Sequence, residues 1–270
     1  MQQQQQQQRA QQPRPPQQPT LPAEVNILAV QNQLGMWKTE YKARLTILSA
    51  RAVLVLSLVG ILGGAALVAS DYLLHVSSSW GGLGIIMLCG GLWLAINALL
   101  YYGLRVYTFT EGMVRVKGNS TDVVRWDQIK TIWQKVNKRY LGSFQFGTTH
   151  VYTVQRDDGK KFRFNNGLSK VDALGNTLTQ EVNRRLLPKA IDTYNAGEPV
   201  TFGKLSVTIH GISNGEEIIL WNQVKNIQVN KGALAINKDG QWLNWTNIKV
   251  SRIPNFPVFM SLVDYIMKST

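Results

Sequence analysis

Cysteine is almost absent from this 270-residue chain, which contains Cys89 alone, accompanied by only three histidines. A lone cysteine excludes intramolecular disulfides and zinc sites built on cysteine. The histidines, His75, His150 and His210, lie far apart, and none has a second ligand at the spacing that metal sites use. The sequence therefore predicts neither a metal nor any other cofactor.

Catalytic motifs are missing as well. The chain has no glycine-rich phosphate loop, no nucleophile elbow and no paired-carboxylate motif. Asp157 and Asp158 precede Gly159 between two apolar runs, which is the pattern of a tight turn. We therefore expect a protein that binds or organises other molecules, and an enzyme is the least supported class.

Formal charge is missing from two long apolar runs, residues 52–70 and 83–102. A helix rises about 1.5 Å per residue, so each run can cross a hydrocarbon core about 30 Å thick. Buried helices of soluble domains usually carry a polar stripe, which neither run shows. The sequence therefore predicts a transmembrane hairpin over residues 47–103, with spans at about 50–70 and 82–103.

The charges around these runs predict the orientation of the hairpin. Residues 71–82 contain no Lys or Arg, whereas Lys42, Arg44 and Arg105 flank the hairpin on its outer sides. Lys and Arg are retained on the cytoplasmic side of a membrane. We therefore expect a multi-pass cell-membrane protein whose N- and C-termini are both cytoplasmic.

Small residues recur at one-turn spacing in both runs. Gly60 and Gly64 share a face of the first span, and Gly91 and Ala95 share a face of the second. Small residues at this spacing let two helix backbones approach closely. We predict that helices pack through these four residues, within the hairpin or between the copies of a homo-oligomer.

The N-terminal region divides into two parts. Residues 1–22 contain eleven Gln and five Pro, a composition typical of a disordered tail. Residues 23–46 carry one apolar stripe at the helical period, formed by Val30, Leu34, Trp37, Tyr41 and Leu45. We predict an amphipathic helix there, which either lies on the membrane interface or packs on the domain that follows.

After the hairpin the apolar period changes from helical to two. Short β-branched and aromatic runs, separated by turn residues, predict strands over residues 106–110, 113–117, 122–126, 129–136, 150–156 and 161–165, with one more over 141–146. A helix should follow, with one face formed by Val171, Leu174, Leu178 and Val182, and should end before Pro188.

The same order then returns. The segment 126–132, beginning Trp126-Asp127-Gln128-Ile129, reappears at 221–227, beginning Trp221-Asn222-Gln223-Val224, and a second helix with Val258, Leu262 and Ile266 ends the chain. We predict an internal duplication, with one antiparallel sheet domain over residues 104–195 and a smaller copy over 196–270, each closed by a helix. The repeated tryptophans should pack in the two cores.

This order of strands, with a Trp entering a central strand and one closing helix, resembles the pleckstrin-homology-like (PH-like) fold. With the hairpin and the phrase Glu198-Pro199-Val200-Thr201-Phe202-Gly203, residues 40–270 are similar to bacterial membrane proteins with cytoplasmic PH-like domains, a largely uncharacterised family. The resemblance implies an α+β membrane protein, with a two-helix transmembrane hairpin followed by two PH-like domains that bind or scaffold and have no catalytic residues. Of the phosphoinositide signature of eukaryotic relatives, only Arg115 and Lys117 are present.

The net charge of +13 is unevenly placed, because residues 104–190 carry sixteen Lys or Arg against seven Asp or Glu. One face of the first domain is predicted to hold the candidate binding residues Lys135, Lys138, Arg139, Lys160, Lys161 and Arg163. An ordinary solvated face would explain them; otherwise they would contact anionic lipid headgroups, at about 1 kcal/mol per basic residue. Nucleic acid comes third, because membrane tethering makes the location awkward.

The function that these observations favour is a membrane-anchored binding or scaffolding module that contacts anionic lipid or a protein partner. The alternative is a structural protein that assembles the membrane through oligomers, driven by the glycine faces and the sheet edges.

Overall fold

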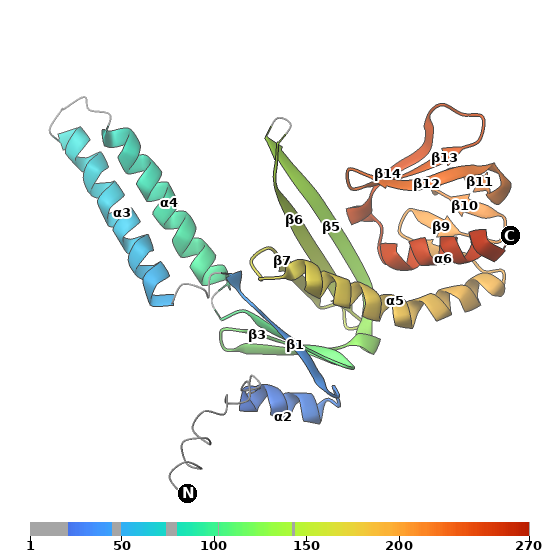
Figure 1. The fold of residues 1–270 in the computed structure, drawn as a ribbon, viewed down its shortest axis with the longest axis horizontal. Coiled ribbons are helices and arrows are strands. Elements are labelled where there is room, and N and C mark those ends of the chain that lie inside the picture. The colour runs from blue at the N-terminus through green and yellow to red at the C-terminus, as the bar shows by residue number, and fades with distance from the viewer. Residues whose placement is uncertain (1–20, 45–49, 74–79, 102, 142–143, 270) are drawn as a thin grey trace, which may run out of the picture.

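In a computed structural model of the chain, the described residues are 21–44, 50–73, 80–101, 103–141 and 144–269 (Figure 1). These parts of the chain form five α-helices and four antiparallel sheets, so the fold is of the predicted α+β class. Nearly all of the predicted disordered tail, residues 1–22, lies outside them.

The first unit consists of a four-stranded sheet of order β1-β2-β3-β4, a three-stranded sheet of order β5-β6-β7 and the helix α5. Its elements are β1 (Trp37–Lys42), β2 (Arg105–Phe109), β3 (Gly112–Lys117), β4 (Ser120–Arg125), β5 (Ile129–Leu141), β6 (Phe144–Arg156), β7 (Lys161–Asn165) and α5 (Val171–Asn195). Of the strand predicted over residues 141–146, Leu141 ends β5 and residues 144–146 begin β6, which pairs with β5 along one long antiparallel hairpin, and residues 142–143 lie outside the described residues.

The second unit repeats this plan with shorter strands. Its elements are β8 (Val200–Phe202), β9 (Leu205–Val207), β10 (Gly211–Ser213), β11 (Ile218–Leu220), β12 (Val224–Asn230), β13 (Ala233–Lys238), β14 (Asn244–Lys249) and α6 (Phe256–Ser269). Strands β8 to β11 form the four-stranded sheet, and β12 to β14 form the three-stranded one. The buried face of α6 includes Val258, Leu262 and Ile266, as the sequence predicts.

The repeated tryptophans begin equivalent 3-10 turns, η2 (Trp126–Gln128) and η3 (Trp221–Gln223). The Trp126 indole N–H donates to the Phe109 carbonyl at 3.3 Å, and the Trp221 indole N–H donates to the Thr208 carbonyl at 3.0 Å. Each turn thus fixes its tryptophan at the end of the second strand of its own sheet, at the last residue of β2 and at the residue that follows β9. Trp126 is 1% exposed, whereas Trp221 is only half-buried, so the predicted core position holds fully for the first copy alone.

Residues 23–44 do not form the single amphipathic helix that the apolar stripe predicts over residues 23–46, and Leu45, the last residue of that stripe, lies outside the described residues. The helix α2 (Ala23–Gln31) ends early, and left-handed residues at Gln33 and Gly35 reverse the chain before β1. Strand β1 pairs antiparallel with β2, with Tyr41 opposite Val106. The stripe was misread because it joins residues of two different cores: Leu34 packs with α2, whereas Tyr41 lies in the main core.

The position of β1 changes the extent of the first unit. Its first strand precedes the apolar hairpin and its second strand follows it, so the hairpin is an insertion between two paired strands. The predicted boundary at residue 104 therefore omits part of this unit, which includes residues 21–44.

Helix α2 covers the outer face of the four-stranded sheet in the first unit only. It packs on Tyr107, Phe109 and Val114, which are all buried. The two tryptophan turns make equivalent hydrogen bonds, so the two copies can be aligned by these bonds. In that alignment the three residues correspond to Ser206, Thr208 and Ser213 of the second unit. Because the second copy has small polar residues there, its outer face needs no covering helix.

Helix α5 joins the two units and runs through Pro188, where the sequence predicts its end. A proline inside a helix removes one backbone hydrogen bond and clashes with the carbonyl four residues earlier. Apolar packing beyond it offsets that cost, because Ala190 is buried and Ile191 and Tyr194 pack against the common core. The Asn183 side-chain amide also donates to the Ser261 hydroxyl of α6 at 3.1 Å.

Candidate functional site

Helices α3 (Ala50–Leu73) and α4 (Trp80–Tyr101) pack side by side, away from the sheets (Figure 1). Among the described residues, one stretch, Ala52–Leu73, is long and apolar enough to cross a membrane. The described apolar part of α4, Trp80–Ile96, is shorter than such a span requires.

Glycines bring the two helices into backbone contact. A Cβ atom added to Gly60 would lie 3.1 Å from the Gly91 Cα, and one added to Gly64 would lie 2.6 Å from the Gly84 carbonyl oxygen. Three of the four predicted packing residues, Gly60, Gly64 and Gly91, thus stand at the contact, and Ala95 is half-buried. Sequence reasoning missed Gly84, although its spacing from Gly91 is two helical turns.

The outward faces of both helices are apolar and bare. On α3, Leu58, Val59 and Leu62 are all more than half exposed, as are Ile86 and Trp93 on α4. A soluble protein rarely exposes an apolar surface of this extent. This surface is the first component of the candidate site.

The second component is the outer face of the sheet β5-β6-β7, which we call the basic face. Trp133 on β5, Thr153 on β6 and Arg163 on β7 lie opposite one another in register, and therefore on one side of the sheet. The Lys161 ammonium lies 5.3 Å from the centre of the Trp133 ring, a cation–π contact. Lys135 is exposed on the same face of β5.

The structure separates Lys160 from this group. It lies in the turn between β6 and β7, where its ammonium contacts the Asp122 carboxylate at 2.5 Å. Lys138 and Arg139 belong to β5, but their side chains fall outside the described residues. Of the six predicted binding residues, Lys135, Lys161 and Arg163 therefore share the basic face.

Ion pairs decide which basic residues of the first unit are neutralised. Asp122 pairs with both Arg115 and Lys160, and Asp158 pairs with Arg156. The hydrogen bond from Arg156 lowers the pKa of Asp158 to about 2, so this carboxylate is charged at neutral pH. Lys135, Lys161 and Arg163 are in no ion pair with any described residue, so the basic face keeps its charge.

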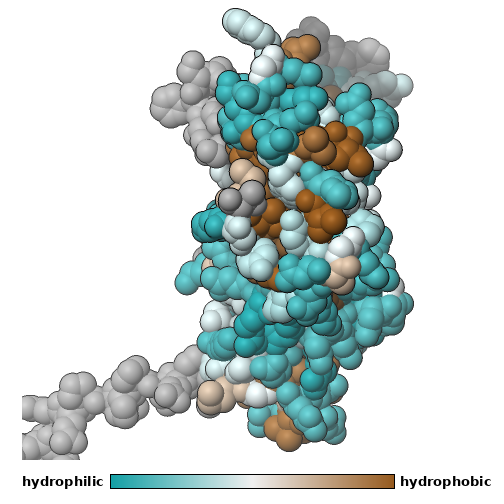
Figure 2. Space-filling model, turned by 90° about the vertical axis from the view of Figure 1, so that its right-hand side faces the viewer, coloured by the Kyte–Doolittle hydropathy of each residue, from teal (hydrophilic) through white to brown (hydrophobic). Residues whose placement is uncertain are grey.

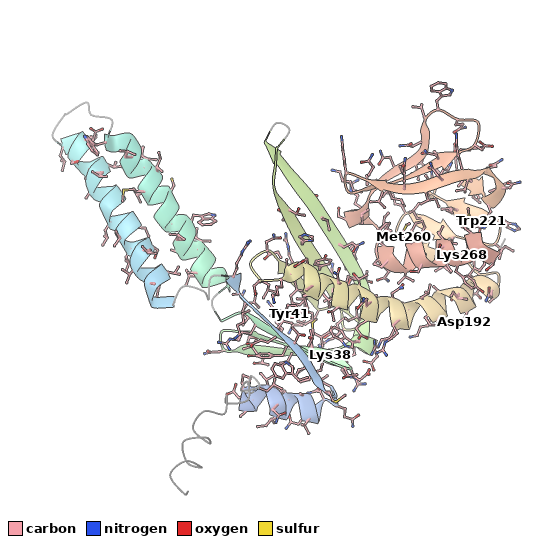
Figure 3. The ribbon with its side chains drawn as sticks, in the orientation of Figure 1. Lys38, Tyr41, Asp192, Trp221, Met260 and Lys268 are labelled. Atoms are coloured by element: carbon pink, nitrogen blue, oxygen red, sulfur yellow. The ribbon has the colours of Figure 1, made fainter. Side chains whose placement is uncertain are left out.

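A separate ion-pair network holds β1 under α5, where Figure 3 shows Lys38 and Tyr41. Glu181 of α5 accepts from Lys38 at 3.4 Å and from Arg185 at 2.6 Å, and Arg185 also pairs with Glu111 at 2.6 Å. Burial alone raises the pKa of Glu181, but the hydrogen bond from Arg185 and the nearby arginine charges outweigh it. The net effect lowers this pKa. The network therefore fixes the strand that precedes the helical insertion.

The third component, which sequence reasoning missed, is the junction between the units. Strand β5 is an edge strand, and Asn255, just before α6, binds its free edge. The Asn255 Oδ1 accepts from the Ile132 N–H at 2.8 Å, its Nδ2 donates to the Lys130 carbonyl at 3.1 Å, and its backbone N–H donates to the Ile132 carbonyl at 2.8 Å. These hydrogen bonds join the edge of β5 in the first unit to the start of α6 in the second unit.

A cleft of about 520 Å³ lies beside this junction. Gln134, Lys135, Val136 and Asn137 of β5 form one wall, and the second unit forms the other with Lys231, Gly232, Ala233, Lys249, Val250, Ser251 and Arg252. Among the described residues, no group of three or more His, Cys, Asp or Glu is placed to hold a metal ion. The cleft offers basic side chains, the polar side chains of Gln134, Asn137 and Ser251, and backbone groups.

The arrangement defines an α+β protein with a bare apolar helix pair, a basic sheet face and a junction cleft. Over residues 1–270 the chain matches DUF6585, a family of unknown function, and it belongs to that family. No curated protein and no solved structure matches it.

Proposed function

We propose that the protein is anchored in a membrane by α3 and α4, which cross the bilayer as a hairpin. The bare apolar surface of both helices and their glycine contact support this topology. Both ends of the insertion connect to neighbouring strands, because Lys42 of β1 pairs with Arg105 of β2. In this arrangement the two units lie on one side of the membrane, and the positive flanking charge favours the cytoplasmic side.

Each unit, in this proposal, is a PH-like module. Support comes from the plan itself, in which a four-stranded and a three-stranded antiparallel sheet are closed by one C-terminal helix, twice. A fold of this kind does not determine a function, so the function has to come from a surface.

The function is to hold a cytoplasmic scaffold against anionic lipid headgroups through the basic face. One observation carries it: Lys135, Lys161 and Arg163 have no acidic partner among the described residues, and they share their face with Trp133. The unit that bears this face is the one into which the helix pair is inserted. Anchoring keeps the face close to the membrane, where each basic residue adds about 1 kcal/mol of attraction.

The experiment uses the full chain in lipid nanodiscs, with Cys89→Ala and a fluorophore on Thr153→Cys at the centre of the basic face. Anionic phosphatidylglycerol discs should protect the fluorophore from a water-soluble quencher, and neutral phosphatidylcholine discs should not. Protection should be lost between about 0.1 M and 1 M salt, where the Debye length falls from about 10 Å to about 3 Å.

A pair of charge variants supplies the control. Lys161→Gln with Arg163→Gln should abolish the protection, whereas Lys189→Gln with Lys225→Gln, which removes the same charge from exposed sites elsewhere, should leave it intact. Lipid contact would be refuted if the quenching of the fluorophore did not change with lipid charge, with salt or with either variant pair.

Assembly into oligomers is a second candidate, favoured by exposed apolar residues on an edge strand. Ile218 and Leu220 of β11 are 55% and 42% exposed, on a strand with no second neighbour in its sheet. Figure 2 shows this end of the molecule, where hydrophobic patches interrupt a hydrophilic surface. An oligomer in mild detergent that dissociates on Ile218→Asn with Leu220→Asn would support this candidate, and a monomer would refute it.

A further inference from the structure

The cleft at the unit junction gathers basic side chains from both units without an acidic one. Lys135 comes from the first unit, and Lys231, Lys249 and Arg252 come from the second. No Asp or Glu lines the cleft, and none of the four forms an ion pair with a described residue. Four like charges around one cavity repel one another, and the repulsion is relieved when an anion binds between them.

The backbone at the cleft is held in place. Gly232 packs on the edge of β5 so closely that an added Cβ would lie 3.3 Å from the Val136 carbonyl oxygen. The Val250 N–H donates to the Gly232 carbonyl at 3.0 Å, which connects the two segments of the second unit that form its wall. With Asn255 bound to β5 next to it, the opposite walls have a fixed separation. A site of fixed geometry loses little entropy when it binds its ligand.

We propose that this cleft is a binding site for a phosphate-bearing anion, and that the site exists only where the two units meet. Lys and Arg side chains are the groups that bind phosphate oxygens, as point charges and as two-pronged donors respectively. A volume of about 520 Å³ is within the range of small-molecule sites and exceeds what one bare phosphate needs. The ligand class is therefore a phosphorylated small molecule or a phosphorylated lipid headgroup.

The site shares Lys135 with the basic face of the proposed function, but its other basic residues are different. Lys161 and Arg163 lie on β7, at the far edge of the sheet from β5, and do not line the cleft. Substitutions can therefore remove one site and leave the other. Sequence reasoning could not find the cleft, because its walls come from segments about 100 residues apart in the chain.

The test measures inorganic pyrophosphate binding to the full chain in neutral phosphatidylcholine discs by isothermal titration calorimetry at constant ionic strength. We expect saturable binding of one pyrophosphate per chain. Lys249→Gln with Arg252→Gln should weaken it by at least about tenfold, because each hydrogen bond between charged groups contributes that much or more. The matched control, Lys189→Gln with Lys225→Gln, should change the affinity less than about twofold.

Further arms separate the ligand sources and the two sites. If a lipid headgroup fills the cleft, discs containing phosphatidic acid should compete with pyrophosphate, and if a soluble phosphate ester fills it, they should not. The Lys161→Gln with Arg163→Gln variant should retain pyrophosphate binding even where lipid contact is lost. The proposal is overturned by no saturable binding to the wild-type chain, or by equal losses in the cleft pair and the control pair when both unfold at the wild-type temperature.

Discussion

Asn255 is the residue whose replacement should most directly loosen the junction between the units. It has a φ of 51° and makes two side-chain hydrogen bonds to β5, at 2.8 Å to the Ile132 N–H and at 3.1 Å to the Lys130 carbonyl. Asn255→Gly keeps the left-handed backbone accessible and removes only these two bonds. A net hydrogen bond contributes about 0.5–1.5 kcal/mol, so the expected loss in unfolding free energy is about 1–3 kcal/mol.

A second substitution separates the backbone contribution from the side-chain contribution. Asn255→Ala removes the same two bonds, and relative to Asn255→Gly it adds about 1–2 kcal/mol because Ala, unlike Gly, is strained in the left-handed region, so it should be the more destabilising change. Denaturant unfolding in detergent, followed by tryptophan fluorescence, measures both variants. Asn226→Ala, at an exposed site on β12, is the control and should change the unfolding free energy by less than about 0.5 kcal/mol. Wild-type stability in both Asn255 variants would refute the role of this residue as the joint.

Three further predictions concern the helix pair, the repeat and the ion-pair network. Gly64→Leu should force α3 and α4 apart, because even a Cβ atom there would lie 2.6 Å from the Gly84 carbonyl oxygen. The thermal unfolding temperature in detergent should therefore fall, and an unchanged temperature would contradict the contact. Trp126→Ala should cost about 3–5 kcal/mol as a fully buried truncation, and the half-buried Trp221→Ala should cost less, which denaturant unfolding will compare. Because the pKa of Glu181 is lower in the folded protein, its stabilising contribution is complete above the usual carboxyl pKa of 4.5 and is lost as the pH falls through the folded value. Glu181→Gln should therefore be less stable than wild type at neutral pH but equally stable in acid, and a difference that persists in acid would contradict the pKa shift.

Local patterns in the sequence predict much of this fold. Strand β7 is recognisable because Phe162 and Phe164 alternate with Lys161 and Arg163 directly after the tight turn that follows β6. The same alternation places the two basic residues on one face, so part of the candidate site was predictable. The repeated tryptophan turns are also visible, because each carries the same short segment into the same hydrogen bonds.

The features that could not be predicted depend on contacts between distant segments. Strand β1 contains Trp37 and Tyr41 of the helix-like apolar stripe, and only its pairing with β2, beyond α3 and α4 in the chain, makes it a strand. Pro188 signals a helix end, but packing of α5 on the second unit overrides that local preference. The junction cleft forms only when both units are placed next to one another, and no local sequence pattern predicts that placement.

The proposed function depends on the proposed membrane anchor formed by α3 and α4, and cysteine labelling tests that anchor most directly. In a Cys89→Ala background, Ser78→Cys lies between α3 and α4 in sequence, and Asn119→Cys lies on the exposed turn between β3 and β4. A membrane-impermeant maleimide added to intact cells should label Ser78→Cys, and should label Asn119→Cys only after the membrane is permeabilised. Labelling of Asn119→Cys in intact cells, or protection of Ser78→Cys, would contradict a hairpin that crosses the bilayer and leaves both units in the cytoplasm.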